Sequence, residues 1–355
     1  MENLVRREFG LRTTYLNTSS CGVLPRRAVA AVRALTDELA AGRPGGAGEY
    51  GTVTAVRAAF ARLAGTDADR VAVGGSLATA VGLVARSLPP GAEVLFPEGE
   101  FASVIMPFAA RGDLKTRFVP LDGLAEGIRP GTALVAFSAA QSADGRIADL
   151  AAVRAASAAH GTRTLLDASQ SAGWLPWRAG EWDFTVTVAY KFLLAPRGLS
   201  FLTVTEEAQG TLEPLFPGVF ASADGALYGP PAGLATTARR FDESPAYLTF
   251  HAAAESLEVL AEAGADAVYR RVTALAGRLR EGLAERGYAP LPGESAIVAV
   301  PGLADRVPEL AAAGVVTSAR AGNLRASFHL YNTPAHVDRL LAVLDGTAPT
   351  APAPE

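Results

Sequence analysis

An acidic side chain and a lysine each follow an apolar run near the middle of this chain. Asp167 follows the run at residues 164–166, and Lys191 comes shortly after the β-rich run at residues 184–188. If the two runs form neighbouring strands, their ends present a carboxylate and an amine to the same crevice. Pyridoxal phosphate (PLP) requires this pair, because a lysine forms its Schiff base and an acid keeps its pyridine nitrogen protonated. We therefore expect Asp167 and Lys191 to be the catalytic residues of a PLP-dependent enzyme.

Strand-like and helix-like segments alternate through the first two thirds of the sequence. The expected strands cover residues 70–73, 93–96, 117–119, 133–137, 163–166, 184–188 and 201–204. The expected helices include residues 25–39, 53–63, 77–88 and 147–160, and several of them are closed by glycine or proline. This alternation, with short connections, indicates an α/β fold whose mostly parallel sheet is covered by helices on both faces.

The pattern changes after about residue 244, where a smaller α+β domain is expected. Its expected helices cover residues 247–263, 265–286, 304–312 and 334–344, and its expected strands cover residues 296–300 and 325–330. We therefore predict an N-terminal segment at residues 1–20 that packs at the active site, a large cofactor-binding domain at 21–244 and a small domain at 245–346. A Gly/Pro-rich loop is expected at residues 43–48, and a Pro/Ala/Thr-rich disordered tail at residues 347–355.

The bulk properties are those of a soluble enzyme. The chain has 355 residues, 49% of them hydrophobic, and a net charge of −4, which argues against a nucleic-acid partner. Its single cysteine, Cys21, cannot form an intramolecular disulfide or a cysteine-based metal cluster, and its four histidines lack metal-ligand spacing. The N-terminus lacks the apolar core of a signal peptide, and no run of about 18 apolar residues occurs. We expect a cytoplasmic protein without a membrane partner or a bound metal.

The segments around Asp167 and Lys191 resemble the class V aminotransferase group of fold-type I PLP enzymes. This group includes cysteine desulfurases, kynureninases, isopenicillin epimerase-like proteins and C–S lyases of the ergothioneine pathway. The resemblance extends from Tyr15 to about Leu344. It implies a fold-type I architecture, PLP as cofactor, an amino acid as substrate and a homodimer whose active site is shared between subunits.

The resemblance also implies roles for residues that would hold the cofactor. Gln170 matches the family residue that donates to the phenolic oxygen of PLP, and Phe101 matches the residue that stacks on the pyridine ring, although it could equally be a core aromatic. Glycines at residues 74–75 precede an expected helix, whose free N–H groups and dipole suit a phosphate. The implied phosphate contacts in that turn are Ser76, Leu77 and Ala78.

Two further positions bear on the phosphate. Tyr190 stands where desulfurases have a histidine, and its hydroxyl could reach the phosphate. Desulfurases have a phosphate-binding serine three residues before the lysine, where this chain has Val188. That contact is either lost or replaced, by Thr187 or by the partner subunit. Ser244 resembles a residue that reaches across the family dimer to the phosphate of the other subunit.

The implied substrate site lies around the expected small domain. Arg325 resembles the family arginine that pairs with the α-carboxylate of the substrate, and Arg320 is a second candidate nearby. Ser20 lies in the N-terminal loop that lines the substrate site in the family. Tyr247 is among the residues expected to surround the substrate side chain.

The reaction that the sequence favours is β-elimination. Cysteine desulfurases carry a sulfur-accepting cysteine shortly before the substrate arginine, and residues 317–324 of this chain contain none. The resemblance is closest to ergothioneine-type C–S lyases, which implies that Lys191 takes the α-proton and that a cysteine-derived conjugate or sulfoxide loses its sulfur group. Transamination or epimerisation by the same residues is the alternative, and a non-catalytic protein with a PLP fold is a second one.

Overall fold

The computed structural model describes residues 1–43, 45, 50–230 and 232–347. The expected loop at residues 43–48 and the expected disordered tail at residues 347–355 therefore lie outside the described residues, apart from residues 43, 45 and 347.

A seven-stranded sheet forms the centre of the described chain. Its strand order is β2-β8-β7-β6-β5-β3-β4, and β8 runs antiparallel to both of its neighbours while the other pairs are parallel. The strands are β2 (Val71–Gly74), β3 (Glu93–Pro97), β4 (Lys115–Val119), β5 (Thr132–Ser138), β6 (Arg163–Asp167), β7 (Phe184–Val188) and β8 (Ser200–Val204). The predicted α/β fold with a mostly parallel central sheet is confirmed.

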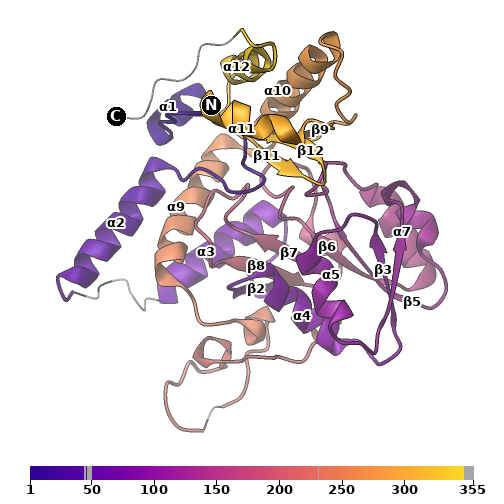
Figure 1. Cartoon of the computed structure of the whole chain (residues 1–355). Coiled ribbons are helices and arrows are strands. Elements are labelled where there is room, and N and C mark those ends of the chain that lie inside the picture. Colours follow the sequence, from indigo (N-terminus) through magenta and orange to yellow (C-terminus); the bar gives the residue numbers. More distant parts are fainter. Residues whose placement is uncertain (44, 46–49, 231, 348–355) are drawn as a thin grey trace.

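Helices cover both faces of this sheet because alternate side chains of each strand point in opposite directions. In β5, Leu134 and Ala136 pack toward α4 (Leu77–Ser87) and α5 (Ala102–Ala109), whereas Val135 and Phe137 pack toward the opposite face. Figure 1 shows this layered arrangement. The helices on that opposite face are α3 (Tyr50–Ala64), α6 (Leu124–Gly127), α7 (Leu150–His160) and α9 (Tyr247–Ala263), with α2 (Arg26–Ala40) packed on α9.

The last part of the chain folds around a small antiparallel sheet of order β11-β12-β9. Its strands are β9 (Ile297–Pro301), β11 (Ser318–Arg320) and β12 (Asn323–Ser327), and its helices are α10 (Ala265–Glu285), α11 (Val307–Ala312) and α12 (Pro334–Leu344). The N-terminal residues pack on this part of the chain. After the short helix α1 (Glu2–Glu8), β1 (Thr14–Tyr15) pairs with β10 (Val315–Val316). The N-terminal segment is thereby held against the C-terminal part of the chain. The division into domains stays a prediction, since α9 packs on α2 and α3.

Some expected boundaries were wrong. The strand expected at residues 325–330 ends at Ser327, since beyond it Asn332 Oδ1 accepts the His329 N–H at 2.7 Å and the chain turns. Helix α7 begins at Leu150 rather than near residue 147, because Asp149 caps it by accepting the Ala152 N–H. Helix α5 was not expected.

In the part of the chain that the structure describes, no helix is both long enough and apolar enough to span a membrane. The same residues contain no cluster of three or more His, Cys, Asp or Glu side chains arranged to hold a metal ion.

Candidate active site

The carboxyl ends of the parallel strands meet at one edge of the large sheet. Asp167 is the last residue of β6 and lies between the ends of β5 and β7, while Lys191 follows β7 by three residues. The register pairs Ser138 with Asp167 and Asp167 with Val186. In open α/β sheets this edge is where ligands bind.

Asp167 and Lys191 form a buried pair of opposite charge. The two residues are 3% and 6% exposed. Burial lowers the pKa of Lys191 to about 8, although the charge of Asp167 acts in the opposite direction. Burial likewise raises the pKa of Asp167, which is opposed by the charge of Lys191 and by the Ser169 N–H that its carboxylate accepts at 2.8 Å. A lysine with this pKa has a substantial fraction of neutral, nucleophilic amine near pH 8.

An aromatic ring stands beside the amine. The Lys191 Nζ lies 5.2 Å from the centre of the Phe101 ring and 5.8 Å from the centre of the Tyr190 ring. Phe101 is 37% exposed, so it is not a core aromatic. Its backbone is held by Glu100, whose buried carboxylate accepts the Phe101 N–H at 2.6 Å. The ring is therefore partly exposed beside the amine, which leaves it accessible to a flat ligand.

The first turn of α4 begins at the same edge, after β2. The Ser76 hydroxyl accepts the Thr79 N–H at 3.2 Å and so acts as the N-cap of the helix. The N–H groups of Leu77 and Ala78 have no acceptor within the helix, which leaves them available to an anion. The Gly75 N–H is donated to the carboxylate of Glu243 at 3.1 Å.

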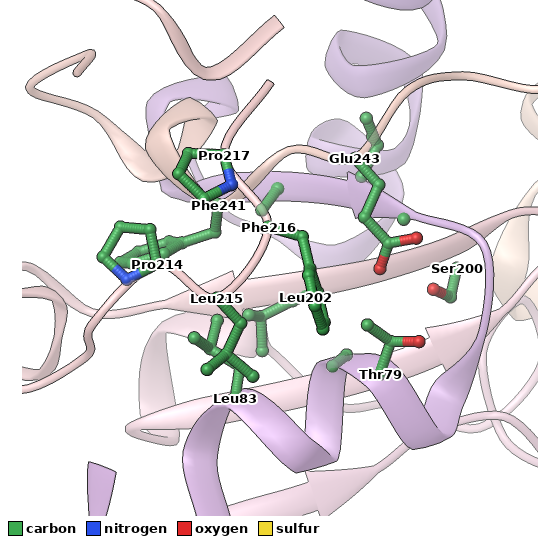
Figure 2. Close-up of a pocket in the computed structure, with 14 residues that line it drawn as sticks. Thr79, Leu83, Ser200, Leu202, Pro214, Leu215, Phe216, Pro217, Phe241 and Glu243 are labelled. Atoms are coloured by element: carbon green, nitrogen blue, oxygen red, sulfur yellow. The ribbon is translucent and has the colours of Figure 1, made fainter. Parts of the chain in front are cut away.

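A pocket lies beside this turn, as Figure 2 shows. Its polar end is formed by Thr79, Ser200 and Glu243. Its apolar end carries Leu83, Leu202, Pro214, Leu215, Phe216, Pro217 and Phe241.

Position 188, where the family serine is missing, has two polar side chains near it. Thr187 pairs with Phe201 and lies on the face opposite to α4, so its role, like that of the partner subunit, stays a prediction. Val188 pairs with Ser200, whose side chain is on the α4 face. The Ser200 hydroxyl donates to the Ser76 carbonyl at 3.0 Å and therefore lies at the start of α4.

Arg325 of β12 lies at the same site, where its charge acts on Lys191. It is 1% exposed, and its guanidinium contacts neutral oxygens of Ser318 (3.2 Å), Ser142 and Ser20 (2.8 Å). Burial lowers the pKa of Arg325 to about 9, and the charge of Arg320 lowers it further. Among the described residues no carboxylate lies within 4.0 Å of this guanidinium. A buried cation without a counter-ion is ready to bind an anion.

Gln170, which follows Asp167 in the chain, is linked to Arg325 through the Ser142 hydroxyl. Its amide nitrogen donates to the Ser19 carbonyl and to the Ser142 hydroxyl, both at 3.0 Å. Its amide oxygen is buried and has no hydrogen-bond partner among the described residues. A buried amide oxygen without a partner is typical of a group that is completed by a ligand.

The structure brings most of the predicted site residues together. The charges of Asp167, Arg325, Arg197 and Arg320 all act on Lys191. Tyr247 packs edge to face on Phe220, with ring centres 6.5 Å apart. Ser244 is exposed beside Asp242, whose buried carboxylate pairs with Arg57 at 2.5 Å. The roles of Tyr247 and Ser244 stay predictions.

Sequence reasoning missed three residues of the site. Ser142 touches both Arg325 and Gln170, Glu100 positions Phe101, and Arg197 lies over the Tyr190 ring at 3.9 Å. Ser142 could have been found, because it follows β5 at the edge where Asp167 ends β6. The same argument would have found Glu100, because it follows β3 at this edge, whereas Arg197 precedes a strand and has no such signal.

These groups fit PLP. A buried amine and a buried carboxylate interact electrostatically, an aromatic ring stands next to the amine, and free N–H groups begin α4. Each would contact a different part of the cofactor: its aldehyde carbon, its pyridine nitrogen, its ring face and its phosphate.

Comparison with known proteins agrees with this geometry. The sequence model described as aminotransferase class V matches residues 48–298. The chain is 28% identical to an uncharacterised aminotransferase, YcbU, of Bacillus subtilis (strain 168), over 77% of this chain and 78% of that protein. It is 29% identical to isopenicillin N epimerase of Streptomyces clavuligerus, over 93% of this chain and 94% of that protein.

Solved structures share the fold. A mutant of C-DES with glycine covalently linked to its PLP cofactor superposes with a TM-score of 0.84 at 22% identity, over 96% of this chain and 97% of that chain. C-DES, described as a cystine C–S lyase, in complex with its product cysteine persulfide gives a TM-score of 0.83 at 24% identity, over 96% and 98% of the two chains.

Proposed function

The chain belongs to the class V aminotransferase family, and on that premise we propose that it is a PLP-dependent C–S lyase. It would act on a cysteine-derived conjugate or sulfoxide by β-elimination. The observation that carries the proposal is the buried pair of Lys191 and Asp167 beside the partly exposed Phe101 ring. The sequence contains one other lysine, Lys115, which is exposed on β4. Lys191 is therefore the lysine that can carry the cofactor at this edge of the sheet.

Each residue has a task in this reaction. Bound PLP supplies an electron sink for the pair of electrons left at Cα when its proton is removed. Lys191 would take that proton at Nζ. Asp167 would keep the pyridine nitrogen protonated, and Arg325 would bind the α-carboxylate so that the Cα–H bond faces the lysine. Phe101 would stack on the ring and exclude water from one face.

The bond that breaks is Cβ–S, and its electron pair leaves on sulfur, which then takes a proton. The three-carbon remainder of the substrate adds water to give pyruvate and ammonia. No sulfur-accepting cysteine is required for this sequence of steps. The absence of cysteine from residues 317–324 supports it over a desulfurase that forms a persulfide on the enzyme.

A second candidate is epimerisation or transamination of an amino acid. It is favoured by the 29% identity to isopenicillin N epimerase, which extends over 93% of this chain. The same lysine would remove the α-proton, and the products would be the inverted amino acid in epimerisation or an oxo acid in transamination. Product analysis separates these reactions.

The test begins with cofactor attachment. Purified protein is supplied with PLP, its absorption spectrum is recorded, and borohydride is added to fix any Schiff base before peptide mass spectrometry. We expect a visible band and a single modified lysine, Lys191. Lys115→Ala is the matched control and should keep the band, whereas Lys191→Ala should lose it. Modification of Lys115 alone, or no band, would overturn the cofactor assignment.

The reaction is then tested by product release. Cysteine S-conjugates, cysteine sulfoxides and plain amino acids are screened for pyruvate and ammonia, with Lys191→Ala as the blank. Pyruvate from an S-conjugate supports the lyase. A cofactor band with no pyruvate, but with inversion at Cα or appearance of an oxo acid, would replace the lyase by the second candidate.

We also propose that two chains form a homodimer, with Ser244 reaching the phosphate of the other subunit. The proposal is supported by large apolar side chains that are strongly exposed on the segment before Glu243, namely Phe216 (69%), Leu227 (72%) and Tyr228 (91%). Light scattering gives the mass directly, and a monomer at micromolar concentration would contradict it.

A further inference from the structure

We propose that the substrate carries a second anionic group in addition to its α-carboxylate, and that Arg320 binds this group at the mouth of the site. The inference rests on the proposed function for the position of the α-carboxylate. It names the chemical class of substrate as a dianionic amino acid, such as a cysteine conjugate with a carboxylate on its sulfur substituent.

The first observation is an excess of positive charge at the site. Arg325, Arg320 and Arg197 all act on Lys191 as like charges. Most of the other arginines that the structure describes are paired, for example Arg57 with Asp242 at 2.5 Å. Within the described chain, none of these three has a carboxylate within 4.0 Å. The site has two buried carboxylates, Asp167, whose charge acts on the lysine, and Glu100, which accepts the Phe101 N–H. In the described chain neither lies within 4.0 Å of the three guanidiniums.

The second observation is that two of these cations converge on one oxygen. The Ser20 hydroxyl accepts from Arg325 Nη2 at 2.8 Å and from Arg320 Nη2 at 3.3 Å. Two guanidiniums that share one neutral acceptor repel each other, and a free energy cost results unless an anion joins them. The lowered pKa of Arg325 has the charge of Arg320 among its causes.

The loop that carries Ser20 is rigidly held, so this convergence is built into the fold. Thr18 shares a hydrogen bond of 2.5 Å with the buried Tyr331 hydroxyl, and the Ser19 hydroxyl donates to Ser327 at 2.9 Å. Ser327 also ends β12, the strand that contains Arg325. A preorganised pair of cations binds an anion without an ordering cost.

The two arginines occupy different depths, which argues for two anions rather than one. Arg325 is 1% exposed in β12, and its guanidinium is already anchored by Ser318 and Ser142. Arg320 is exposed at the end of β11, toward solvent. The phosphate of the cofactor would be held at the start of α4, on the large sheet, and does not compensate Arg320. The anion that would pair with Arg320 is therefore a group of the substrate other than its α-carboxylate.

The test uses two ligands that differ in one charge. S-carboxymethyl-L-cysteine carries a second carboxylate, and S-carbamoylmethyl-L-cysteine has a neutral amide of nearly the same shape. Their dissociation constants are measured by calorimetry on Lys191→Ala protein in excess PLP, which this variant would bind without a Schiff base to the protein and could not use for turnover. We expect the carboxylate ligand to bind about tenfold more tightly than the amide. Adding Arg320→Gln should abolish the preference while the amide ligand binds as before.

Controls keep the outcome specific. Arg33→Gln removes the same charge from the exposed face of α2 and should leave the preference intact. Equal binding of the two ligands, or loss of both in Arg320→Gln, would overturn the proposal, and the second result would mean that Arg320 shares the α-carboxylate. Loss of the preference in Arg197→Gln instead would assign the anion to Arg197. Failure of the proposed function is recognised separately, by a missing cofactor band in the wild-type protein.

Discussion

Glu100 Oε1 accepts the backbone N–H of Phe101 at 2.6 Å, so a buried carboxylate fixes the residue whose ring faces the Lys191 amine. The same oxygen accepts the Ser138 hydroxyl at 2.6 Å, and the other oxygen accepts the Ser138 N–H at 2.7 Å and the Gln141 amide at 3.0 Å. Glu100 thereby ties the ring to the end of β5, one strand away from Asp167.

We predict that Glu100→Gln destabilises the protein and disturbs the stacking ring. A glutamine places an NH₂ group where the carboxylate now accepts N–H and O–H groups, which leaves buried donors unsatisfied and costs about 2–4 kcal/mol of unfolding free energy. Denaturant unfolding measures the loss, and the absorption maximum of bound PLP reports the ring. Glu98→Gln, two residues away and exposed, is the control. Unchanged stability in Glu100→Gln would show that the carboxylate has no positioning role.

Cofactor loading should depend on pH through Lys191. Burial lowers the pKa of Lys191 to about 8, and the neutral amine is the form that attacks an aldehyde. The rate of appearance of the visible band, measured on cofactor-free protein mixed with PLP, should therefore rise with a midpoint near pH 8. A free lysine would place this midpoint near about 10.4. A rate that keeps rising beyond pH 10 would contradict the lowered pKa.

Asp167→Asn should shift that midpoint and reduce turnover. The carboxylate raises the pKa of Lys191 by its charge, so a neutral amide should move the loading midpoint below that of the wild-type protein. Turnover should fall on the order of 100- to 1000-fold, because an amide cannot hold the proton on the pyridine nitrogen as an anion does. The Asn oxygen can still accept the Ser169 N–H, so circular dichroism should show intact folding. Full activity would remove Asp167 from the catalytic residues.

The large sheet and its chemistry could be predicted from local sequence patterns. Residues 184–188 were expected as a strand and form β7, so the position of Lys191 just beyond a strand end followed from alternation alone. Asp167 ends β6 in the same way. Parallel neighbours share an edge, and this places the two side chains together once the strand order is known.

The contacts between distant segments could not be predicted in this way. Ser20 meets Arg325 across 305 positions of sequence, and Arg57 pairs with Asp242 across 185. Neither pairing leaves a periodic pattern in the chain. Helix α5 was missed because it contains Pro107 and has no side-chain cap, so it lacks the start signal that Asp149 gives to α7.

Cys21→Ser distinguishes the lyase from a desulfurase that uses this thiol. Cys21 is far from the arginine motif in the sequence, but the structure brings its neighbours to the site. The Ser20 hydroxyl accepts from Arg325, and the Gly22 N–H donates to the Tyr190 carbonyl at 2.8 Å. In the proposed elimination the sulfur group leaves directly, so the variant should release pyruvate at the wild-type rate. The assay measures pyruvate and free thiol from an S-conjugate, and alanine and reductant-released sulfide from L-cysteine. Alanine and sulfide formed by the wild type but not by Cys21→Ser, with retained cofactor, would make Cys21 a sulfur acceptor.

His329 should make the fold sensitive to acid. The buried ring accepts the Leu330 N–H at Nδ1 (2.8 Å) and bonds the Phe192 carbonyl through Nε2 (2.9 Å), an arrangement that requires the neutral ring with its proton on Nε2. Burial lowers the pKa of His329 from its ordinary value of 6.5 to about 4. Between these values the unfolded chain binds a proton that the folded chain does not, so the free energy of unfolding falls as pH drops through this window, by up to about 3 kcal/mol.

His329→Gln tests this prediction, because glutamine keeps a donor for the Phe192 carbonyl but has no titrating ring. Melting temperatures between pH 7 and 4.5 should therefore fall less steeply in His329→Gln than in the wild type, whereas the exposed control His160→Gln should follow the wild type. Parallel curves for His329→Gln and the wild type would mean that the buried carboxylates, and not this ring, set the acid limit of the fold.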